Sequence, residues 1–264
     1  MNWKISQIGK KPKLKNVVLI EGLPGIGNVG KVAVDFIIDT LKAEKLYEMF
    51  SYTFPHSVFV NEKNLVELPT IEIFYKKMKK GPDLLLLAGD VQPIDEVSCY
   101  EFCEKILDII DGFKGKEIIT LGGVGLQNVP KKPKVYCTGN SQKIIDKYKK
   151  GTALNEKLHG IVGPIVGVSG ILLGLAEKRK IPSIALLAET FGHPMYLGVK
   201  GAREILKVLN KKLNLNINIK NMDKEIRDIE NEMIKRTEEL SEVSKQTALK
   251  KVKGKIGKEV SYIG

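Results

Sequence analysis

A glycine-rich segment near the amino terminus has the residue spacing of a phosphate-binding turn. Residues 25–30 read Gly-Ile-Gly-Asn-Val-Gly, the G-x-G-x-x-G pattern that brings a backbone close to a dinucleotide pyrophosphate. Residues 25–31 also spell G-x-x-x-x-G-K, but Val32 stands where a nucleotide loop needs the hydroxyl that ligates magnesium. The acidic residue that would bind a ribose is also missing, because Glu48 lies too early in the next strand. We therefore interpret the segment as a tight structural turn whose edge faces a partner, with nucleotide binding as the alternative.

Further polar side chains follow the apolar segments that we expect to be parallel strands. Ligands gather at the carboxyl ends of such strands, so these side chains could converge on one cleft. A carboxylate, a histidine and a serine together could form an acid–base or nucleophilic site. The candidate cleft residues are Glu21, Gly22, Gly25, Gly27, Gly30, Asp90, Gln92, Ser169, Glu189 and His193.

The same residues also have ordinary structural explanations. Ser169 lies in Gly-Val-Ser-Gly and not in the G-x-S-x-G turn that presents a nucleophile. Asp90 and Glu189 could cap helices or accept hydrogen bonds from loop N–H groups, and His193 could hold a turn beside Pro194. We therefore assign no catalytic residue and expect neither a metal ion nor a cofactor. A small-molecule enzyme that acts on a nucleoside or a phosphate ester remains the alternative.

Alternating strand and helix signals predict the elements that would position these residues. Buried strands are expected at 16–21, 83–89, 117–122 and 183–189, with less buried ones at 58–60, 70–75 and 135–138. Helices are expected at 29–41, 94–111, 141–149, 164–179 and 200–213. Residues 122–140, rich in glycine, proline and lysine, are expected to form an exposed excursion. This order predicts a three-layer α/β domain with a mostly parallel sheet over residues 1–215.

The composition limits the classes of partner and the compartment. The net charge is +12, but nearly all of the excess is lysine, scattered without the arginines and aromatic side chains of a nucleic-acid groove. Nucleic acid is therefore an unlikely partner. The start of the chain lacks a signal peptide, and the most apolar window, 161–176, is too short and too rich in glycine to span a membrane. Three cysteines without a disulfide pattern indicate reduced thiols, so we expect a cytoplasmic protein with no membrane contact.

The character of the sequence changes beyond residue 215. Residues 216–250 are expected to form a helical extension with a narrow apolar seam of coiled-coil spacing, or a helix packed on its own domain. The seam consists of Met222, Ile226, Ile229, Met233, Leu240 and Val243. Residues 251–264 read as a flexible basic tail.

Five segments in sequence order resemble the proteasome assembly chaperone 2 family in its archaeal branch. They are Gly-Leu-Pro-Gly-Ile-Gly-Asn-Val-Gly at 22–30, Gly-Asp-Val-Gln-Pro at 89–93, Ile-Ile-Thr-Leu-Gly-Gly at 118–123, Gly-Pro-Ile-Val-Gly-Val-Ser-Gly-Ile-Leu-Leu-Gly-Leu-Ala at 163–176 and Glu-Thr-Phe-Gly-His-Pro at 189–194. The match extends over residues 17–210, nearly the whole predicted domain.

The resemblance implies a fold of the phosphorylase/hydrolase-like α/β type without established catalysis. It also implies a homo-oligomer that binds α-subunits of the proteasome core particle. Some proteasome partners end in a hydrophobic residue, a tyrosine and one final residue, which dock between α-subunits. Tyr262 lies one position away from that pattern, so the resemblance implies docking only in a shifted register.

Overall fold

The computed structural model describes residues 3–155, 157, 163–193 and 196–222. The chain divides into two compact units, Met1–Ile219 and Lys220–Gly264. The strands of the first unit are β1 Trp3–Gln7, β2 Val18–Glu21, β3 Glu44–Ser51, β4 Phe59–Val60, β5 Val66–Glu67, β6 Ile71–Lys76, β7 Leu84–Gly89, β8 Glu117–Leu126, β9 Val135–Gly139 and β10 Ser183–Phe191. Its α-helices are α1 Val29–Leu41, α2 Glu96–Gly112, α3 Gln142–Lys149, α4 Val168–Lys178 and α5 Val199–Leu213. Short 3-10 turns are η1 Ile26–Asn28 and, at the junction of the units, η2 Ile219–Asn221.

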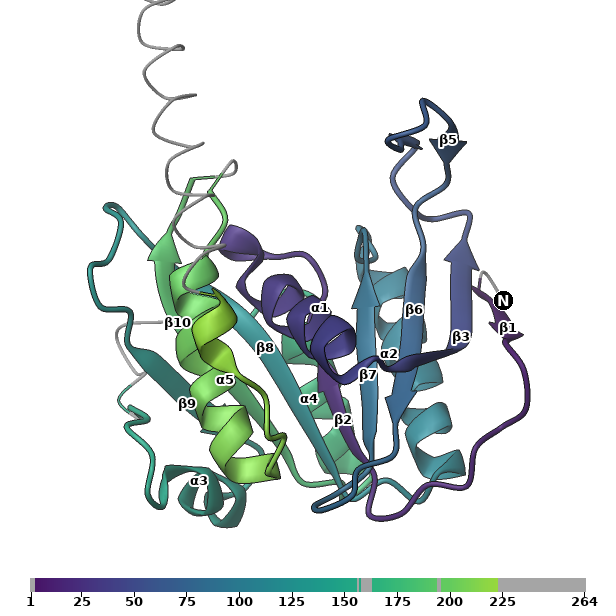
Figure 1. The fold of residues 1–264 in the computed structure, drawn as a ribbon. Coiled ribbons are helices and arrows are strands. Elements are labelled where there is room, and N and C mark those ends of the chain that lie inside the picture. Colours follow the sequence, from purple (N-terminus) through teal and green to yellow (C-terminus); the bar gives the residue numbers. More distant parts are fainter. Residues whose placement is uncertain (1–2, 156, 158–162, 194–195, 223–264) are drawn as a thin grey trace, which may run out of the picture. The chain divides into compact units, whose positions relative to one another are not determined.

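One eight-stranded sheet forms the middle layer, in the order β1-β3-β6-β7-β2-β8-β10-β9. The central strands β7, β2, β8 and β10 run parallel, and antiparallel strands extend the sheet on both sides. Helices α1 and α5 cover one face, and α2 and α4 pack together on the other (Figure 1). The predicted three-layer α/β fold with its parallel centre is therefore confirmed.

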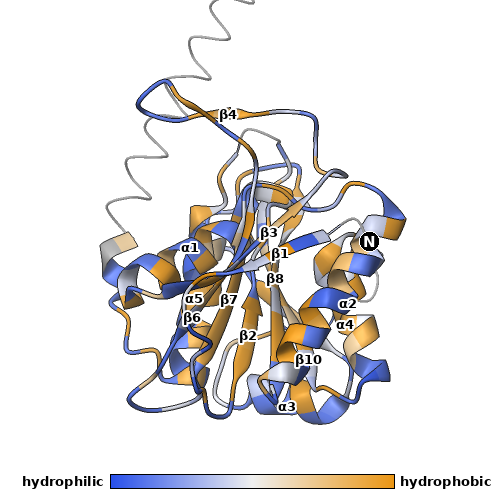
Figure 2. Ribbon diagram, turned by 90° about the vertical axis from the view of Figure 1, so that its right-hand side faces the viewer, coloured by the Kyte–Doolittle hydropathy of each residue, from blue (hydrophilic) through white to orange (hydrophobic). Residues whose placement is uncertain are grey.

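The apolar residues of the central strands explain their position. Every residue of β2 and β7 is buried, which is the pattern of a strand covered on both faces. Figure 2 shows these strands as a hydrophobic centre between the helices. Phe102 and Ile106 of α2 and Leu172 of α4 bury their side chains in one core cluster with Leu19 and Leu85 of the sheet. The burial of this cluster holds α2 and α4 against one face of the sheet.

Three predicted segments differ in the structure. The helix expected at 164–179 is α4 and begins later, at Val168. Residues 122–126, expected in an exposed excursion, continue β8 to Leu126, and only the segment 127–134 forms the connecting loop to β9. Glycine usually weakens a strand. At position 123, however, a side chain has no room, because an added Cβ would lie 2.2 Å from the Ile26 carbonyl oxygen. The strand expected at 58–60 does not join the main sheet, because β4 pairs only with β5 in a separate hairpin.

Among the helices of the described part of the chain, none combines the length and the apolar character that a membrane span requires.

Candidate functional site

The end of β2 lies at the point where the connections of the sheet change direction. From β2 the chain builds β3, β6 and β7 on one side, and after β7 it crosses over through α2 to β8 on the other side. Glu21, the last residue of β2, therefore has β7 and β8 as its two neighbours, opposite Leu87 and Thr120. In open α/β sheets this switch point leaves a crevice beyond the strand ends, which is where ligands bind.

The glycine-rich turn after β2 packs tightly against the protein. A Cβ on Gly22 would lie 2.3 Å from the Gly30 carbonyl oxygen, and a Cβ on Gly30 would lie 2.5 Å from the Leu121 carbonyl oxygen of β8. Gly27 has a φ of 61°, and a Cβ added to it would lie 2.5 Å from the Thr190 hydroxyl oxygen. These three glycines are required because backbone segments approach one another closely here.

The remaining features of the turn do not complete a nucleotide site. Gly25 has open space around its Cβ position, with no atom within 4 Å, and it lines the cavity described below. Lys31 forms an ion pair of 2.9 Å with Asp35 on α1 and does not line that cavity. The dominant role of the motif in this structure is therefore close packing of η1 and α1 on β8 and β10.

A cavity of about 910 Å³ opens at the switch point. Four segments and Leu187 of β10 line it. The segments are the end of β2 with the turn that follows, residues within 92–100, the end of β8, and residues within 163–171. Its size is within the range of about 300–1,000 Å³ that small-molecule sites occupy. Of the predicted cleft residues, Glu21, Gly25, Gly30, Gln92 and Ser169 line it.

Glu21 is almost completely buried, with 1% of its surface exposed. Its Oε1 accepts a hydrogen bond from the Leu23 N–H at 3.0 Å, and its Oε2 accepts one from the Ser169 hydroxyl at 2.8 Å. Burial raises the pKa of the Glu21 carboxyl from 4.5 to about 7, because the charged form loses its hydration and these hydrogen bonds restore only part of it. The carboxyl can therefore gain or lose a proton near neutral pH.

Gln92 links the two loops that border Glu21. Its side-chain amide donates to the Pro24 carbonyl at 2.9 Å and accepts from the Val168 N–H, at 3.3 Å, in the first turn of α4. Gly167, with a φ of 85°, allows this contact because an added Cβ would lie 2.6 Å from the Gln92 oxygen. Gln92 thereby positions the start of α4, and with it Ser169, over the end of β2.

Five of the predicted cleft residues do not line the cavity, so the expectation of a single convergent cleft was wrong for them. Gly22 and Gly27 are packed in the glycine-rich turn, and Asp90, Glu189 and His193 lie elsewhere. Asp90 accepts hydrogen bonds from the backbone and hydroxyl of Thr70, at 3.1 and 3.3 Å, which hold it beside the start of β6. Glu189 accepts from the Lys134 N–H and the Tyr136 hydroxyl, both at 2.9 Å, because the edge strand β9 lies beside it.

His193 lies beyond the end of β10 and does not line the cavity. Its ring stacks on Phe191, with ring centroids 5.6 Å apart and an angle of 12° between the planes. In the cavity Ser169 is within hydrogen-bond distance of Glu21, but His193 is not beside them. Ser169, His193 and Glu21 therefore do not form a serine–histidine–carboxylate triad.

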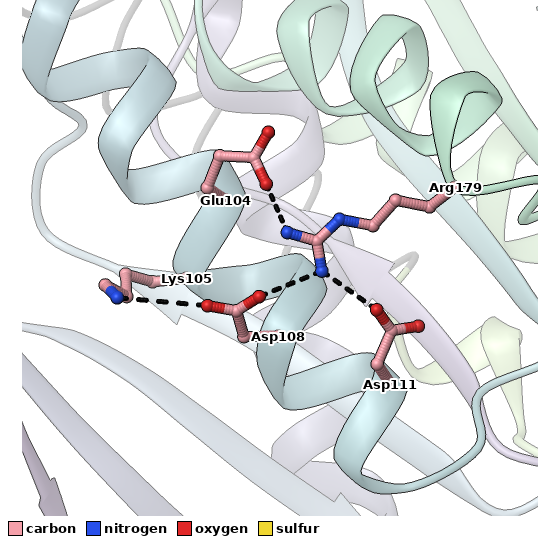
Figure 3. Close-up of polar contacts among 5 residues, drawn as sticks. All are labelled: Glu104, Lys105, Asp108, Asp111 and Arg179. Atoms are coloured by element: carbon pink, nitrogen blue, oxygen red, sulfur yellow. Dashed lines mark hydrogen bonds and ion pairs between the residues drawn. The ribbon is translucent and has the colours of Figure 1, made fainter.

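An ion-pair network outside the cavity fixes the two helices whose first turns border it. Arg179, directly after α4, contacts Asp108 at 2.9 Å and Asp111 at 2.8 Å, and it also pairs with Glu104, all on α2 (Figure 3). Lys105 adds a weaker contact of 3.8 Å to Asp108 (Figure 3). The network joins the far ends of α2 and α4, and so it supports the relative placement of residues 95–100 and Ser169 at the near ends.

Sequence reasoning missed the part of the cavity wall that α2 contributes. Cys99 and Tyr100 line the cavity from the first turns of α2, and Asp95 caps this helix by accepting a 2.9 Å hydrogen bond from the Ser98 N–H. The aspartate directly before an apolar helical pattern was a usable signal for the start of α2. The side of the helix that faces the β2 end could not be deduced from that signal.

Most of the predicted partner-binding tail lies outside the described residues. Met222 is described, at the end of the described chain. The other predicted tail residues are Ile226, Ile229, Met233, Leu240, Val243 and Tyr262.

Comparisons with known proteins identify relatives over nearly the whole chain. The sequence model of the PAC2 family matches residues 19–236. An uncharacterized protein of Methanocaldococcus jannaschii is 33% identical over 245 residues, which are 90% of this chain and 92% of the relative. The crystal structure of PbaB from Pyrococcus furiosus, an archaeal proteasome activator, has 31% identity and a TM-score of 0.80, covering 90% of this chain and 99% of PbaB. PbaA of the same organism, an archaeal homolog of proteasome-assembly chaperone, has 23% identity and a TM-score of 0.74, covering 95% and 98%, and supports the fold alone.

Proposed function

Because this chain belongs to the PAC2 family, we propose that it is a non-catalytic proteasome-assembly chaperone or adaptor that works in the cytoplasm as a homo-oligomer. It binds α-subunits of the proteasome core particle. The identity of 31% to PbaB, a proteasome activator, supports the proteasome as the class of partner. The five matched sequence segments support the same assignment, since they lie in the part of the chain that the family shares.

The observation that carries a protein-binding role is the exposed hairpin of β4 and β5. It projects from the sheet as a separate two-stranded element (Figures 1 and 2). Val60 and Val66 are directly opposite in its register and are 65% and 70% exposed. Val58 and Leu68 follow at a two-residue spacing and are 51% and 58% exposed.

Such a hairpin favours a partner for two physical reasons. An isolated pair of strands is marginally stable in water, and a contiguous apolar surface on a soluble protein usually marks an interaction site. A partner that covers the four aliphatic side chains would remove apolar surface from water and order the hairpin at the same time. We therefore assign the hairpin a contact with a second protein chain, either another copy or a proteasome subunit.

The predicted helical extension and tail supply a second contact in this proposal. Residues 216–250 would support self-association through their apolar seam, and Tyr262 would contact the core particle. Deletion of residues 223–264 tests this part, because it retains the Asn210 side-chain hydrogen bonds with the Ile217 backbone that secure the chain after α5.

The alternative of an enzyme for nucleosides or phosphate esters has less support. The charged side chains that line the cavity among the described residues are Glu21, Asp95 and Glu96, all acidic. A phosphate group would lie beside like charges there, which is unfavourable. The glycine turn that could have held a phosphate is instead packed against β8 and β10.

The direct test isolates the full chain from its own cell extract under native conditions and identifies the chains that co-elute. Proteasome α-subunits in stoichiometric amounts are expected. The double variant Val60→Ser, Val66→Ser should lose these subunits or form a complex of lower mass, whereas Val129→Ser, an exposed apolar residue on the 127–134 loop, should behave as wild type. Unchanged mass and co-elution of the hairpin variant would refute its role. Absence of proteasome subunits after mild cross-linking would refute the proposed partner.

A further inference from the structure

The cavity at the switch point is not used by a protein-binding function of the hairpin and tail. It differs from the rest of the molecule in its charge. The chain has a net charge of +12, yet the described residues that line the cavity include no lysine, arginine or histidine. Glu21 lines it from the end of β2, and Asp95 and Glu96 line it from the start of α2. A concave site lined by one sign of charge attracts ligands of the opposite sign.

Apart from the two acidic residues at the start of α2, the polar side chains of the cavity lie together near the end of β2. Glu21 and Ser169 form a hydrogen-bonded pair at 2.8 Å, and the Gln92 amide joins the adjacent loops. Around them the wall contains the apolar side chains of Leu23, Ile26, Ile94, Tyr100 and Leu187. A ligand that fits this arrangement has a single polar head and an apolar body.

We propose that the cavity binds a small organic amine, with its ammonium group on the Glu21 carboxylate and its apolar body along the wall. A buried carboxylate is costly unless it is paired, and the two hydrogen bonds from Leu23 and Ser169 do not bring an opposite charge. An ammonium ion supplies that charge and up to three donors. The Ser169 hydroxyl is close enough to Glu21 to accept one of them.

Other titratable groups near Glu21 belong mainly to α2. They are the carboxylates of Asp95 and Glu96, the thiols of Cys99 and Cys103 and the phenol of Tyr100. The hydrogen bond from the Ser98 N–H lowers the pKa of Asp95, so this group stays ionised in mildly acidic solution. On the α4 side Ser169 is the polar contact, and from β8 it is the backbone of Leu121. Loss of amine binding near neutral pH would therefore report on Glu21 and not on Asp95.

Isothermal titration calorimetry with three matched probes tests the proposal on the full chain. Phenethylamine, 2-phenylethanol and 3-phenylpropionate share an aromatic body and differ in the charge of the head group. At pH 8 the amine should bind at least about ten-fold more tightly than the alcohol, the factor that one charge-assisted hydrogen bond supplies. Between pH 8 and pH 5.5 its affinity should fall about thirty-fold, because only the ionised carboxylate pairs with the ammonium group.

Two isosteric variants distinguish pairing with the Glu21 carboxylate from the effect of losing any one negative charge. Glu21→Gln should remove both the preference for the amine and its pH dependence. Asp90→Asn makes the same change of charge outside the cavity and should retain both. The proposal is overturned if the alcohol or the carboxylate binds as tightly as the amine, if Asp90→Asn weakens binding as much as Glu21→Gln, or if wild type shows no binding of phenethylamine at millimolar concentration.

Discussion

Glu21→Gln should stabilise the protein at neutral and alkaline pH but not in acid. In the unfolded chain the Glu21 carboxyl ionises at its ordinary pKa of 4.5, whereas burial holds its pKa in the folded protein at about 7. Between these two values the unfolded state releases a proton that the folded state retains. The free energy of unfolding therefore decreases as the pH rises from 4.5 to 7, and the loss is complete above pH 7.

The size of the effect follows from the same two values. A rise of the pKa from 4.5 to about 7, at about 1.4 kcal/mol for each pKa unit, corresponds to about 3 kcal/mol. Glutamine has the same shape and cannot ionise, and its side-chain oxygen can still accept the Leu23 N–H. The difference in unfolding free energy between the variant and wild type should therefore be near zero below pH 4.5 and about 3 kcal/mol at pH 8.

Urea unfolding across this pH range measures the difference. Trp3, the single tryptophan, is a suitable fluorescence probe because it packs on Phe54 and Phe102, with ring centroids at 5.5 and 4.7 Å. Subtracting the unfolding free energy of wild type from that of the variant at each pH cancels the contributions of the other titrating groups. A flat difference for Glu21→Gln, or one that grows towards acid pH, would refute the argument from burial.

Three other perturbations test packing, the helix network and the tail. Gly30→Ala should destabilise the protein by about 1–3 kcal/mol in urea unfolding, because the new Cβ would lie 2.5 Å from the Leu121 carbonyl oxygen. The control Gly25→Ala meets no atom within 4 Å and should be close to neutral, and equal effects of the two substitutions would contradict the packing role of Gly30. Arg179→Met should cost at most about 1 kcal/mol at low salt and less in 1 M salt, since its three partners on α2 are largely exposed, and a cost independent of salt would argue against ion pairing. Deletion of residues 223–264 should leave the thermal unfolding of the α/β domain in place but lower the complex mass or abolish proteasome binding, and an unchanged mass with unchanged binding would rule out the role of the tail.

The sequence predicted the central elements well because their signals are local. The apolar runs that became β2 and β7 are long enough and apolar enough to indicate strands covered on both faces. The helix expected at 29–41 is α1, Val29–Leu41, whose start is set by the glycine turn and whose end has Lys42 in a left-handed conformation. The family resemblance, based on five short segments in order, is confirmed by the match of the PAC2 family over residues 19–236.

The sequence predicted one edge strand of the sheet, β9, but not the other, β1. Strand β1 buries chiefly Trp3 and exposes its other residues, so its pattern lacks the alternation that indicates a strand, and it forms because β3 offers a free edge. The strand expected at 58–60 was predicted to join the sheet, but β4 pairs with β5, because nothing in a short apolar run specifies its partner strand. Pairing between distant segments is decided by the tertiary structure.

The candidate site shows the same division between local and tertiary information. The types and spacing of residues were enough to identify Glu21, Gln92 and Ser169 as polar groups at strand ends and helix starts, because those positions follow from the order of elements along the chain. Their convergence on one cavity, and the separation of Glu189 and His193 from it, depend on the strand order and on which neighbour each side chain meets. The raised pKa of Glu21 also has a tertiary cause, since only the packing of α2, α4 and β8 around β2 removes the carboxyl from water.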